Sequence, residues 1–437
     1  MLGLVFVGLI FIAIVAACLF RPALGAIGFY FFYLLDPKWN WRWVVPQDIA
    51  FQKYLFAALI IGLVFQGFKF AKQARPCRRG ILLGWLFFVI CFISASQSIS
   101  PPTSDAFNSV LWKELIVAMI AILVIRTRQH VTFLFVASLI GISYNSYQIN
   151  LDYFQTGFTR FAYSKWGSYQ LDNNTLSLMM IPFIAVGLSF AVFERIAWRR
   201  VCYFLASLLL IHQVMLTMSR GAMLGALPGI ALLLWKAPRS RRNLRDFTIA
   251  IACVVVLAGP SVVKEFSTIF ESAENRDSSA ESRFYLWKAG AKITADHPLL
   301  GVGPNAGRYL VPRPQYWEGD PINSGSKALH NVFFDLSTGI GIPGLLIFLS
   351  LFAIPMLHAW KTYDRDDYVL GPINLSVLCG LTSYFCASIF SSGLLIESPY
   401  IFLVAGYALI NIRADEQSSV PGQLTFSTPQ HHIPSAT

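Results

Sequence analysis

Charged residues are scarce in this sequence. Asp, Glu, Lys and Arg make up 13% of its 437 residues, about half of the roughly 25% that is usual for soluble domains. Hydrophobic residues make up 55%, and the mean hydropathy is +0.57. Too few polar groups remain to cover the surface of a soluble protein, so the composition indicates an integral membrane protein.

Several catalytic signatures are also missing. The chain has no P-loop, no His-Glu-x-x-His, no Cys/His metal cluster and no Gly-x-Ser-x-Gly elbow. The loops that we place on the non-cytoplasmic side hold no aspartate pair typical of a divalent-dependent glycosyltransferase. We therefore expect no metal and no cofactor. None of the seven cysteines falls in the longest hydrophilic stretch, 264–330, which argues against a disulfide framework.

Long apolar stretches are abundant instead. Because a spanning helix needs roughly 20 apolar residues, they predict an all-α polytopic bundle of about 12 transmembrane helices. Arg21-Pro22 separates the first two stretches, which cross the membrane either once or twice. We therefore expect residues 1–412 to form a single transmembrane domain. We expect the polar residues 413–437 to form a disordered cytoplasmic tail. The stretches are 2–20, 23–35, 52–68, 80–96, 109–125, 131–147, 176–193, 201–217, 222–235, 246–263, 331–359, 368–390 and 398–412.

Basic residues gather in five short loops between these stretches. The segmentation places all five on one side of the membrane, which the Lys/Arg rule identifies as the cytoplasm. The net charge of +11 is thereby explained without a nucleic-acid partner. The basic loops are Lys69 to Arg79, Arg126 to Arg128, Arg195 to Arg200, Lys236 to Arg245 and Lys361 to Arg365.

The loop 264–330 is the longest on the opposite side. It carries as many acidic as basic residues, and apolar side chains recur in 280–295 at near-helical spacing. This pattern predicts an amphipathic helix along the membrane surface. His297-Pro298 is expected to end that helix, and the glycines of 300–305 to form a tight turn.

Three residues that can carry chemistry stand where helices meet the outer loops: Arg220, Arg283 and His330. An arginine near the hydrocarbon needs a partner or a water-filled cavity, and its guanidinium group binds phosphate oxygens well. Each of the three residues also has a structural explanation that involves no ligand. Arg220 can be a snorkelling interfacial residue, Arg283 can pair with Asp277 or Glu281, and His330 can open a helix that Asn331 caps.

Two weaker features accompany them. Asp172-Asn173-Asn174 stands at the outer entrance of the stretch 176–193, either as a helix cap or as hydrogen-bonding partners for sugar hydroxyls. Lys113 and Glu114 lie inside the stretch 109–125, where charges are costly unless they pair or face a cavity.

The chain resembles the O-antigen ligase and polymerase superfamily over roughly residues 170–360. Its early Leu35-Asp36-Pro37 and its Asp172-Asn173-Asn174 are similar to a branch of putative O-glycosylation ligases, although many members have Pro-Asn where this chain has Asn173-Asn174. Four motifs in order carry the main resemblance: Met218-Ser219-Arg220-Gly221-Ala222, Ser282-Arg283-Phe284 with Trp287, His297-Pro298-Leu299-Leu300-Gly301-Val302-Gly303, and Leu329-His330-Asn331 followed by Gly339-Ile340-Gly341-Ile342-Pro343-Gly344.

This resemblance implies a GT-C-like helical bundle in the bacterial inner membrane with its active site facing the periplasm. It implies a metal-independent transfer of a saccharide from undecaprenyl pyrophosphate to an acceptor hydroxyl, on lipid A-core or a similar molecule. It assigns donor pyrophosphate binding to Arg220 and Arg283 and catalysis to His330. Glycan contacts are expected from Asn331, Asp172, Asn173 and Asn174.

Other functions stay open at this point. The acceptor can be a glycolipid, a growing glycan or a protein, so that the chain is a ligase, a polysaccharide polymerase or a protein O-oligosaccharyltransferase. A transporter or flippase fits the number of spans. Two features argue against a transporter or flippase: the spans contain few charged residues, and the sequence shows no duplication of one half of the chain in the other.

Overall fold

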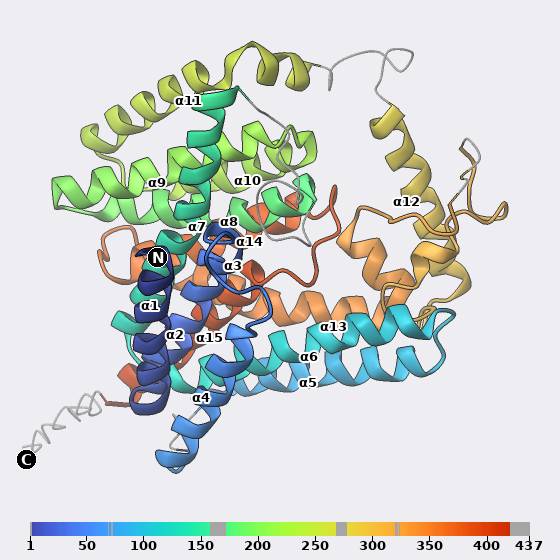
Figure 1. Ribbon diagram of the computed structural model, residues 1–437, viewed down its shortest axis with the longest axis horizontal. Coiled ribbons are helices and arrows are strands. Elements are labelled where there is room, and N and C mark those ends of the chain that lie inside the picture. Colours follow the sequence, from blue (N-terminus) through green and yellow to red (C-terminus); the bar gives the residue numbers. More distant parts are fainter. Residues whose placement is uncertain are drawn as a thin grey trace, which may run out of the picture.

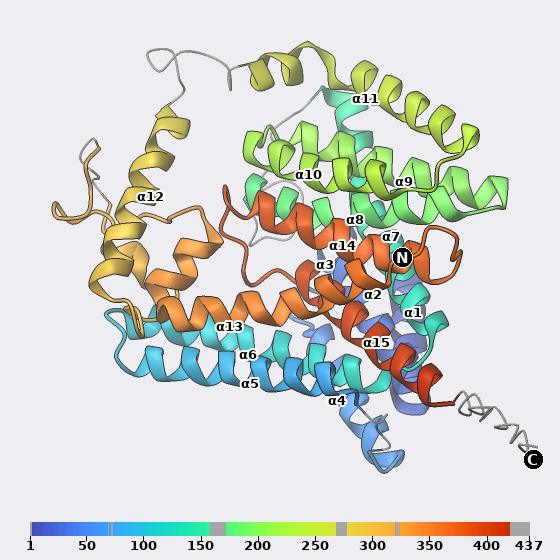
Figure 2. The same ribbon diagram turned by 180° about the vertical axis from the view of Figure 1, so that it is seen from behind.

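A computed structural model describes residues 2–68, 70, 73–157, 172–267, 278–319, 322 and 324–419. Within these ranges the regular elements are helices, and no β-strand occurs (Figures 1 and 2). Seven of the described helices are long and apolar enough to cross a membrane. The predicted polytopic helical membrane protein is therefore confirmed, whereas the number of about 12 crossings stays a prediction.

Each predicted apolar stretch coincides with a helix. The first half of the chain contains α1 (Leu2–Phe20), α2 (Pro22–Leu35), α3 (Pro37–Asn40), α4 (Phe51–Phe65), α5 (Arg75–Ser96), α6 (Pro101–Val124), α7 (Arg128–Thr156) and α8 (Asn173–Phe193). The second half contains α9 (Ala197–Leu216), α10 (Arg220–Lys236), α11 (Arg241–Ser267), α12 (Ser278–Asp296), the short 3-10 helix η3 (Gly307–Tyr309), α13 (Val332–Thr362), α14 (Leu370–Ala387) and α15 (Ser398–Ser419).

The first two helices form an antiparallel hairpin. They separate at Arg21, because Pro22 opens α2 and lacks the N–H that would continue α1. A Cβ atom added to Gly25 would lie 2.4 Å from the Cα of Cys18, so the two backbones touch near the turn. The chain thus folds back on itself within its first 35 residues.

Helix α8 forms the centre of the bundle. Its apolar window is 100% buried, which fits a helix that is hydrophobic on every side. It packs against α9, α10 and α14, which surround it in both views of the fold (Figures 1 and 2). The N-terminal end of α8 carries Asn173 and Asn174, so the most buried helix of the bundle positions these side chains.

Two of the sequence motifs meet at a break in α13. Gly341 has φ +74° and interrupts the helix. The break leaves backbone groups of α13 without hydrogen bonds inside the helix, and the loop after α12 provides partners for them. The amide of Gly303 donates to the carbonyl of Gly339 at 3.0 Å, and the amide of Ile342 donates to the carbonyl of Pro298 at 2.8 Å. Gly301, with φ +63°, makes the close approach possible, so the predicted tight turn serves to lock the loop onto α13.

The amphipathic helix is confirmed as α12, but its surroundings differ from the prediction. Leu286 and Ile293 are buried in a small core of the outer loop itself, together with Val302 and Leu310. The loop therefore covers the face that was expected to lie on the bilayer. Helix α12 stands at the edge of the molecule, beside the ends of α5, α6 and α13 (Figures 1 and 2).

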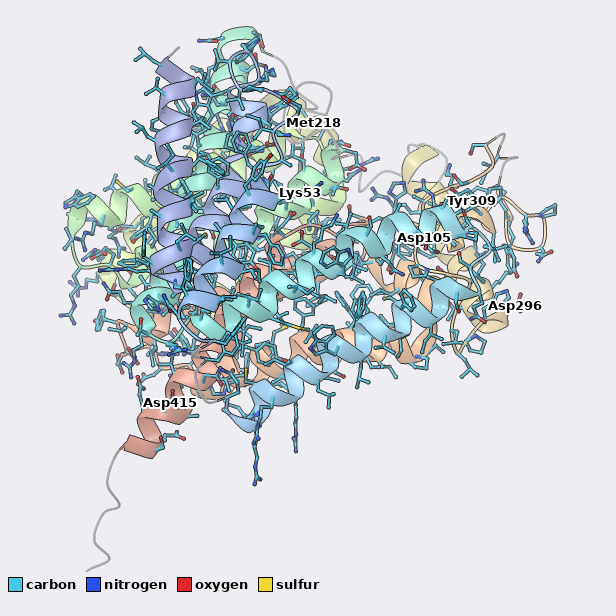
Figure 3. All side chains as sticks on the ribbon, turned by 60° about the horizontal axis from the view of Figure 1, so that its bottom comes forward. Lys53, Asp105, Met218, Asp296, Tyr309 and Asp415 are labelled. Atoms are coloured by element: carbon cyan, nitrogen blue, oxygen red, sulfur yellow. The ribbon has the colours of Figure 1, made fainter. Side chains whose placement is uncertain are left out.

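Two boundaries differ from those predicted. Helix α6 begins at Pro101 rather than at 109, because two prolines favour the first turn of a helix. Helix α15 continues to Ser419, so the start of the predicted disordered tail at Arg413 is wrong; residues 420–437 lie outside the described residues. In Figure 3, Asp105, Asp296 and Tyr309 lie at one end of the molecule and Asp415 at the other.

Candidate functional site

The turn between α9 and α10 presents Arg220. Ser219 caps α10 by accepting a hydrogen bond from the amide of Ala222 at 3.4 Å, and Arg220 is the first residue of the helix. Met218 precedes them with φ +52°, a left-handed conformation that is costly for a residue with a side chain. The turn is thus sharp, and it directs Arg220 from the start of a helix, where the helix dipole also favours an anion.

Side chains from α8 hold this turn in place. The hydroxyl of Ser219 donates to the amide oxygen of Asn174 at 2.7 Å, and the side chain of Asn173 donates to the carbonyl of Thr217 at 3.0 Å. These contacts give both asparagines a positioning role next to Arg220. Their predicted contact with sugar hydroxyls remains a prediction.

Arg283 reaches the same turn from α12. A Cβ atom added to Gly221 would lie 3.2 Å from Nη1 of Arg283, so the guanidinium group lies directly over the first residues of α10. Its central carbon lies 5.9 Å from the ring of Phe390, which packs in turn on Trp287. Within the described residues no carboxylate pairs with Arg283, and the side chains of Asp277 and Glu281 lie outside that part.

The charges of Arg283 and Arg220 act on each other. Burial, together with the positive charge of Arg220, lowers the pKa of Arg283. Two positive charges that influence each other in this way repel, and an anion bound between them would relieve this repulsion. Guanidinium forks match the oxygens of a phosphate or pyrophosphate, so this part of the site is suited to such a ligand.

His330 lies within electrostatic reach of Arg283. It directly precedes the cap of α13 and has φ +51°, a second left-handed non-glycine residue within the site. Burial lowers its pKa, and the positive charges of Arg283, Lys327 and Arg308 lower it further, while Asp172 acts in the opposite direction. These effects favour the neutral imidazole, which is the form that can accept a proton.

The residues next to His330 and at the start of α8 act as helix caps. The side chain of Asn331 accepts hydrogen bonds from the amides of Phe333 and Phe334 at 2.9 and 3.2 Å. Asp172 caps α8 through the amide of Thr175 at 2.8 Å. The capping role considered for both residues is thus observed. Their role in substrate binding stays a prediction.

Sequence reasoning missed the segment that joins these parts. Phe390 belongs to the stretch between α14 and α15, where no motif marks it, yet its ring touches both Arg283 and the site of Gly221. Lys327 and Arg308, which influence His330, also escaped notice. Their only signal in the sequence is that they are cations on the outer side, where cations are expected to be few.

Two families of proteins match parts of the chain. Residues 204–349 match the O-antigen ligase family, and residues 1–152 match a family of unknown function. No curated protein matches the chain. Arg220, Arg283 and His330 all fall within the first match, which lies inside the region 170–360 where the resemblance was found. The second family had not been recognised from the sequence.

Proposed function

Because residues 204–349 form an O-antigen ligase domain in a polytopic helical membrane protein, we propose that the chain transfers a saccharide from a polyprenyl-pyrophosphate donor to an acceptor hydroxyl. The donor is undecaprenyl pyrophosphate carrying a glycan. The reaction takes place at the outer, periplasmic ends of the helices in the bacterial inner membrane. One observation carries the proposal: Arg283 lies against the turn of Arg220 and its charge acts on His330.

His330 is the proton acceptor in this proposal. The acceptor oxygen attacks the anomeric carbon of the donor sugar, and the bond between that carbon and the pyrophosphate oxygen breaks. The proton of the acceptor hydroxyl passes to the neutral imidazole of His330. The products are the glycosylated acceptor and the free polyprenyl pyrophosphate.

Arg220 and Arg283 stabilise the leaving group. Negative charge builds up on the pyrophosphate oxygen as its bond to the sugar breaks, and two fixed guanidinium groups meet this charge without reorganisation. Since the pyrophosphate bond supplies the driving force, no nucleotide is needed. We propose no metal ion and no cofactor for the reaction.

The test is identification of the product. Purified protein would be incubated with a defined polyprenyl-pyrophosphate glycan and with a glycolipid, a glycan-bearing lipid carrier or a peptide as acceptor, and the products analysed by mass spectrometry. The proposal expects one new acceptor–glycan bond and one released polyprenyl pyrophosphate per transfer. If the donor moves across proteoliposome membranes with every bond intact, the proposal is wrong and a flippase fits instead. Lipid-linked products of growing length would identify a polymerase.

A further inference from the structure

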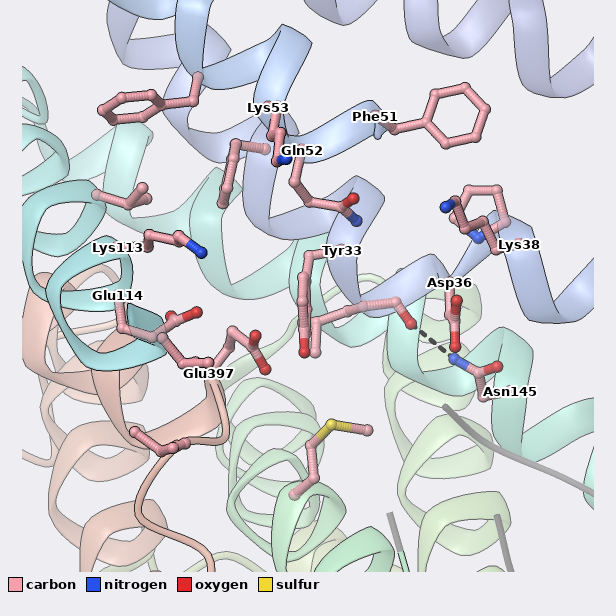
Figure 4. Close-up of a pocket in the computed structure, with 18 of the residues that line it drawn as sticks. Tyr33, Asp36, Lys38, Phe51, Gln52, Lys53, Lys113, Glu114, Asn145 and Glu397 are labelled. Carbon is pink, nitrogen blue, oxygen red and sulfur yellow. Dashed lines mark hydrogen bonds between the residues drawn. The ribbon is translucent and has the colours of Figure 1, made fainter. Parts of the chain in front are cut away.

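A separate cavity is lined mostly by residues of the segment 1–152, which matches the family of unknown function, and partly by α8 and by the stretch before α15. It has a volume of about 630 Å³ and lies between the outer ends of α2 and α4, the middle of α6 and the first turns of α8 (Figure 4). Phe29, Phe56, Val117 and Met180 contribute apolar walls. The site formed by Arg220, Arg283 and His330, here called the arginine–histidine site, does not line this cavity.

Lysines stand at the mouth of this cavity. Lys53 at the start of α4 and Lys113 on α6 line it, and both are exposed. In Figure 4, Lys53 lies above the space beside Gln52, and the ammonium group of Lys113 points into it from the left. Point charges of this kind attract phosphate groups.

Carboxyl groups form the floor. The side chains of Glu114 and Glu397 converge in Figure 4, with Tyr33 beside them. Glu397 is only 4% exposed. Its carboxyl group interacts with Tyr33 and Glu114, while its Oε2 atom finds no further hydrogen-bond partner among the described residues. A buried oxygen without a partner is costly, and a ligand hydroxyl that donates to it would remove this cost.

Two apolar helices flank the opening of the cavity. Helices α4 and α6 both pack on α2 and flank the mouth. Lys113 lies 12 residues after Pro101 (113 − 101 = 12), about 18 Å along an apolar helix that is long enough to span the membrane. The neighbouring Trp112 and Tyr54 are exposed. A ligand that enters here from the bilayer keeps its hydrocarbon chains outside, against these side chains.

We propose that this cavity is a second binding site, which takes from the bilayer an amphiphile whose head carries a phosphate group and, beyond it, hydroxyl groups. The phosphate lies at Lys53 and Lys113, and the hydroxyls donate to Glu397 and Glu114. A head with phosphate alone would leave the floor without donors, and a head with hydroxyls alone would leave the lysines without an anion. The binding itself does not rest on the ligase proposal.

The site is placed to serve that reaction as well. The stretch between α14 and α15 touches Arg283 through Phe390 and lines the cavity through Leu395 and Glu397. Helix α8 likewise contributes Asn174 to the arginine site and Met180 to the cavity. These two segments thus contribute residues to both sites. If the ligase proposal is right, the cavity is where an acceptor lipid would be anchored.

The test is lipid binding by native mass spectrometry on the full chain in detergent. The probes are phosphatidylglycerol, which has a phosphate and hydroxyls, phosphatidic acid, which lacks the hydroxyls, and diacylglycerol, which lacks the phosphate. We expect phosphatidylglycerol to bind at least tenfold more tightly than diacylglycerol, and more tightly than phosphatidic acid. The pair Lys53→Gln and Lys113→Gln is expected to weaken binding of both phosphate-bearing lipids at least tenfold. Glu397→Leu is expected to abolish only the preference for phosphatidylglycerol over phosphatidic acid.

Matched controls keep the test decisive. Lys288→Gln with Lys292→Gln removes two outer lysines that pair with Glu318 away from the cavity, and is expected to leave binding unchanged. Val110→Trp narrows the cavity while keeping both lysines, and is expected to weaken binding even if the lysine variant fails to fold. Arg283→Gln is expected to leave lipid binding intact, which separates this proposal from the ligase mechanism. Equal binding of the three lipids by the wild type, or unchanged binding after Val110→Trp, would overturn the proposal.

Discussion

The hydroxyl of Ser219 donates a hydrogen bond of 2.7 Å to the amide oxygen of Asn174, and so joins the cap of α10 to the first turn of α8. Arg220 follows Ser219 directly. Because α8 is the most buried of the described membrane helices, this bond holds the start of α10, and with it Arg220, against the core of the protein.

Asn174→Ala tests this positioning role. Losing the hydrogen bond is expected to destabilise the fold by only about 1 kcal/mol. Transfer is expected to fall more, between about tenfold and a hundredfold, since a small displacement of Arg220 disturbs the geometry of the leaving group. Transfer assays alongside thermal unfolding in detergent separate the two effects. Unchanged transfer would remove Asn174 from the positioning of Arg220.

The guanidinium groups can be tested separately from the rest of the basic residues. Arg220→Gln and Arg283→Gln are each expected to lower the transfer rate by about 10²- to 10³-fold, because each removes a charge that meets the developing pyrophosphate anion. Arg199→Gln, an exposed arginine near the opposite end of α9, serves as control and should retain full activity. A similar loss in all three variants would point to a general charge effect.

The pH dependence of transfer follows from His330. Its pKa lies below the usual 6.5 because of burial and the positive charges around it. The neutral base is therefore present at pH 7, and transfer is expected to fall only as the pH drops through the lowered pKa. Lys327→Gln removes one of those charges, raises the pKa of His330 and shifts the acid limb of the profile to higher pH. Lys292→Gln is not expected to move it, and an identical shift in both would argue against His330 as the titrating group.

The break in α13 makes a prediction about stability. A Cβ atom on Gly341 would lie 2.2 Å from the carbonyl oxygen of Leu299, and its φ is +74°. Gly341→Ala is therefore expected to destabilise the protein by about 3–5 kcal/mol. Gly157→Ala is the matched control: it has φ +68° but no atom within 4 Å, so only the backbone cost of about 1–2 kcal/mol applies. Thermal unfolding of both variants in the same detergent compares them, and equal losses would contradict the role of the packed loop.

The helices could be predicted from the sequence because hydrophobic length is a local property. Helix α8 and the amphipathic α12 both follow from apolar spacing within one segment. The packing partner of α12 could not be predicted in this way. The residues that cover Leu286 come from a loop of irregular structure, and nothing local in that loop indicates what it folds against.

The site residues were likewise predictable from the sequence only in part. Arg220, Arg283 and His330 stand out in the sequence because cations and a histidine are unusual at outer helix ends. Lys113 and Glu114 were visible as charges within an apolar stretch, but their cavity was not. Its floor depends on Glu397, 283 positions after Glu114 (397 − 114 = 283), and only the fold brings the two together.

Glycan transfer by His330→Ala is the most direct test of the ligase mechanism. The variant would be compared with the wild type in a single-turnover assay with saturating polyprenyl-pyrophosphate glycan, after binding of the donor has been measured for both. The account predicts normal donor binding through Arg220 and Arg283, and loss of transfer. Transfer at the wild-type rate by this variant would contradict the account.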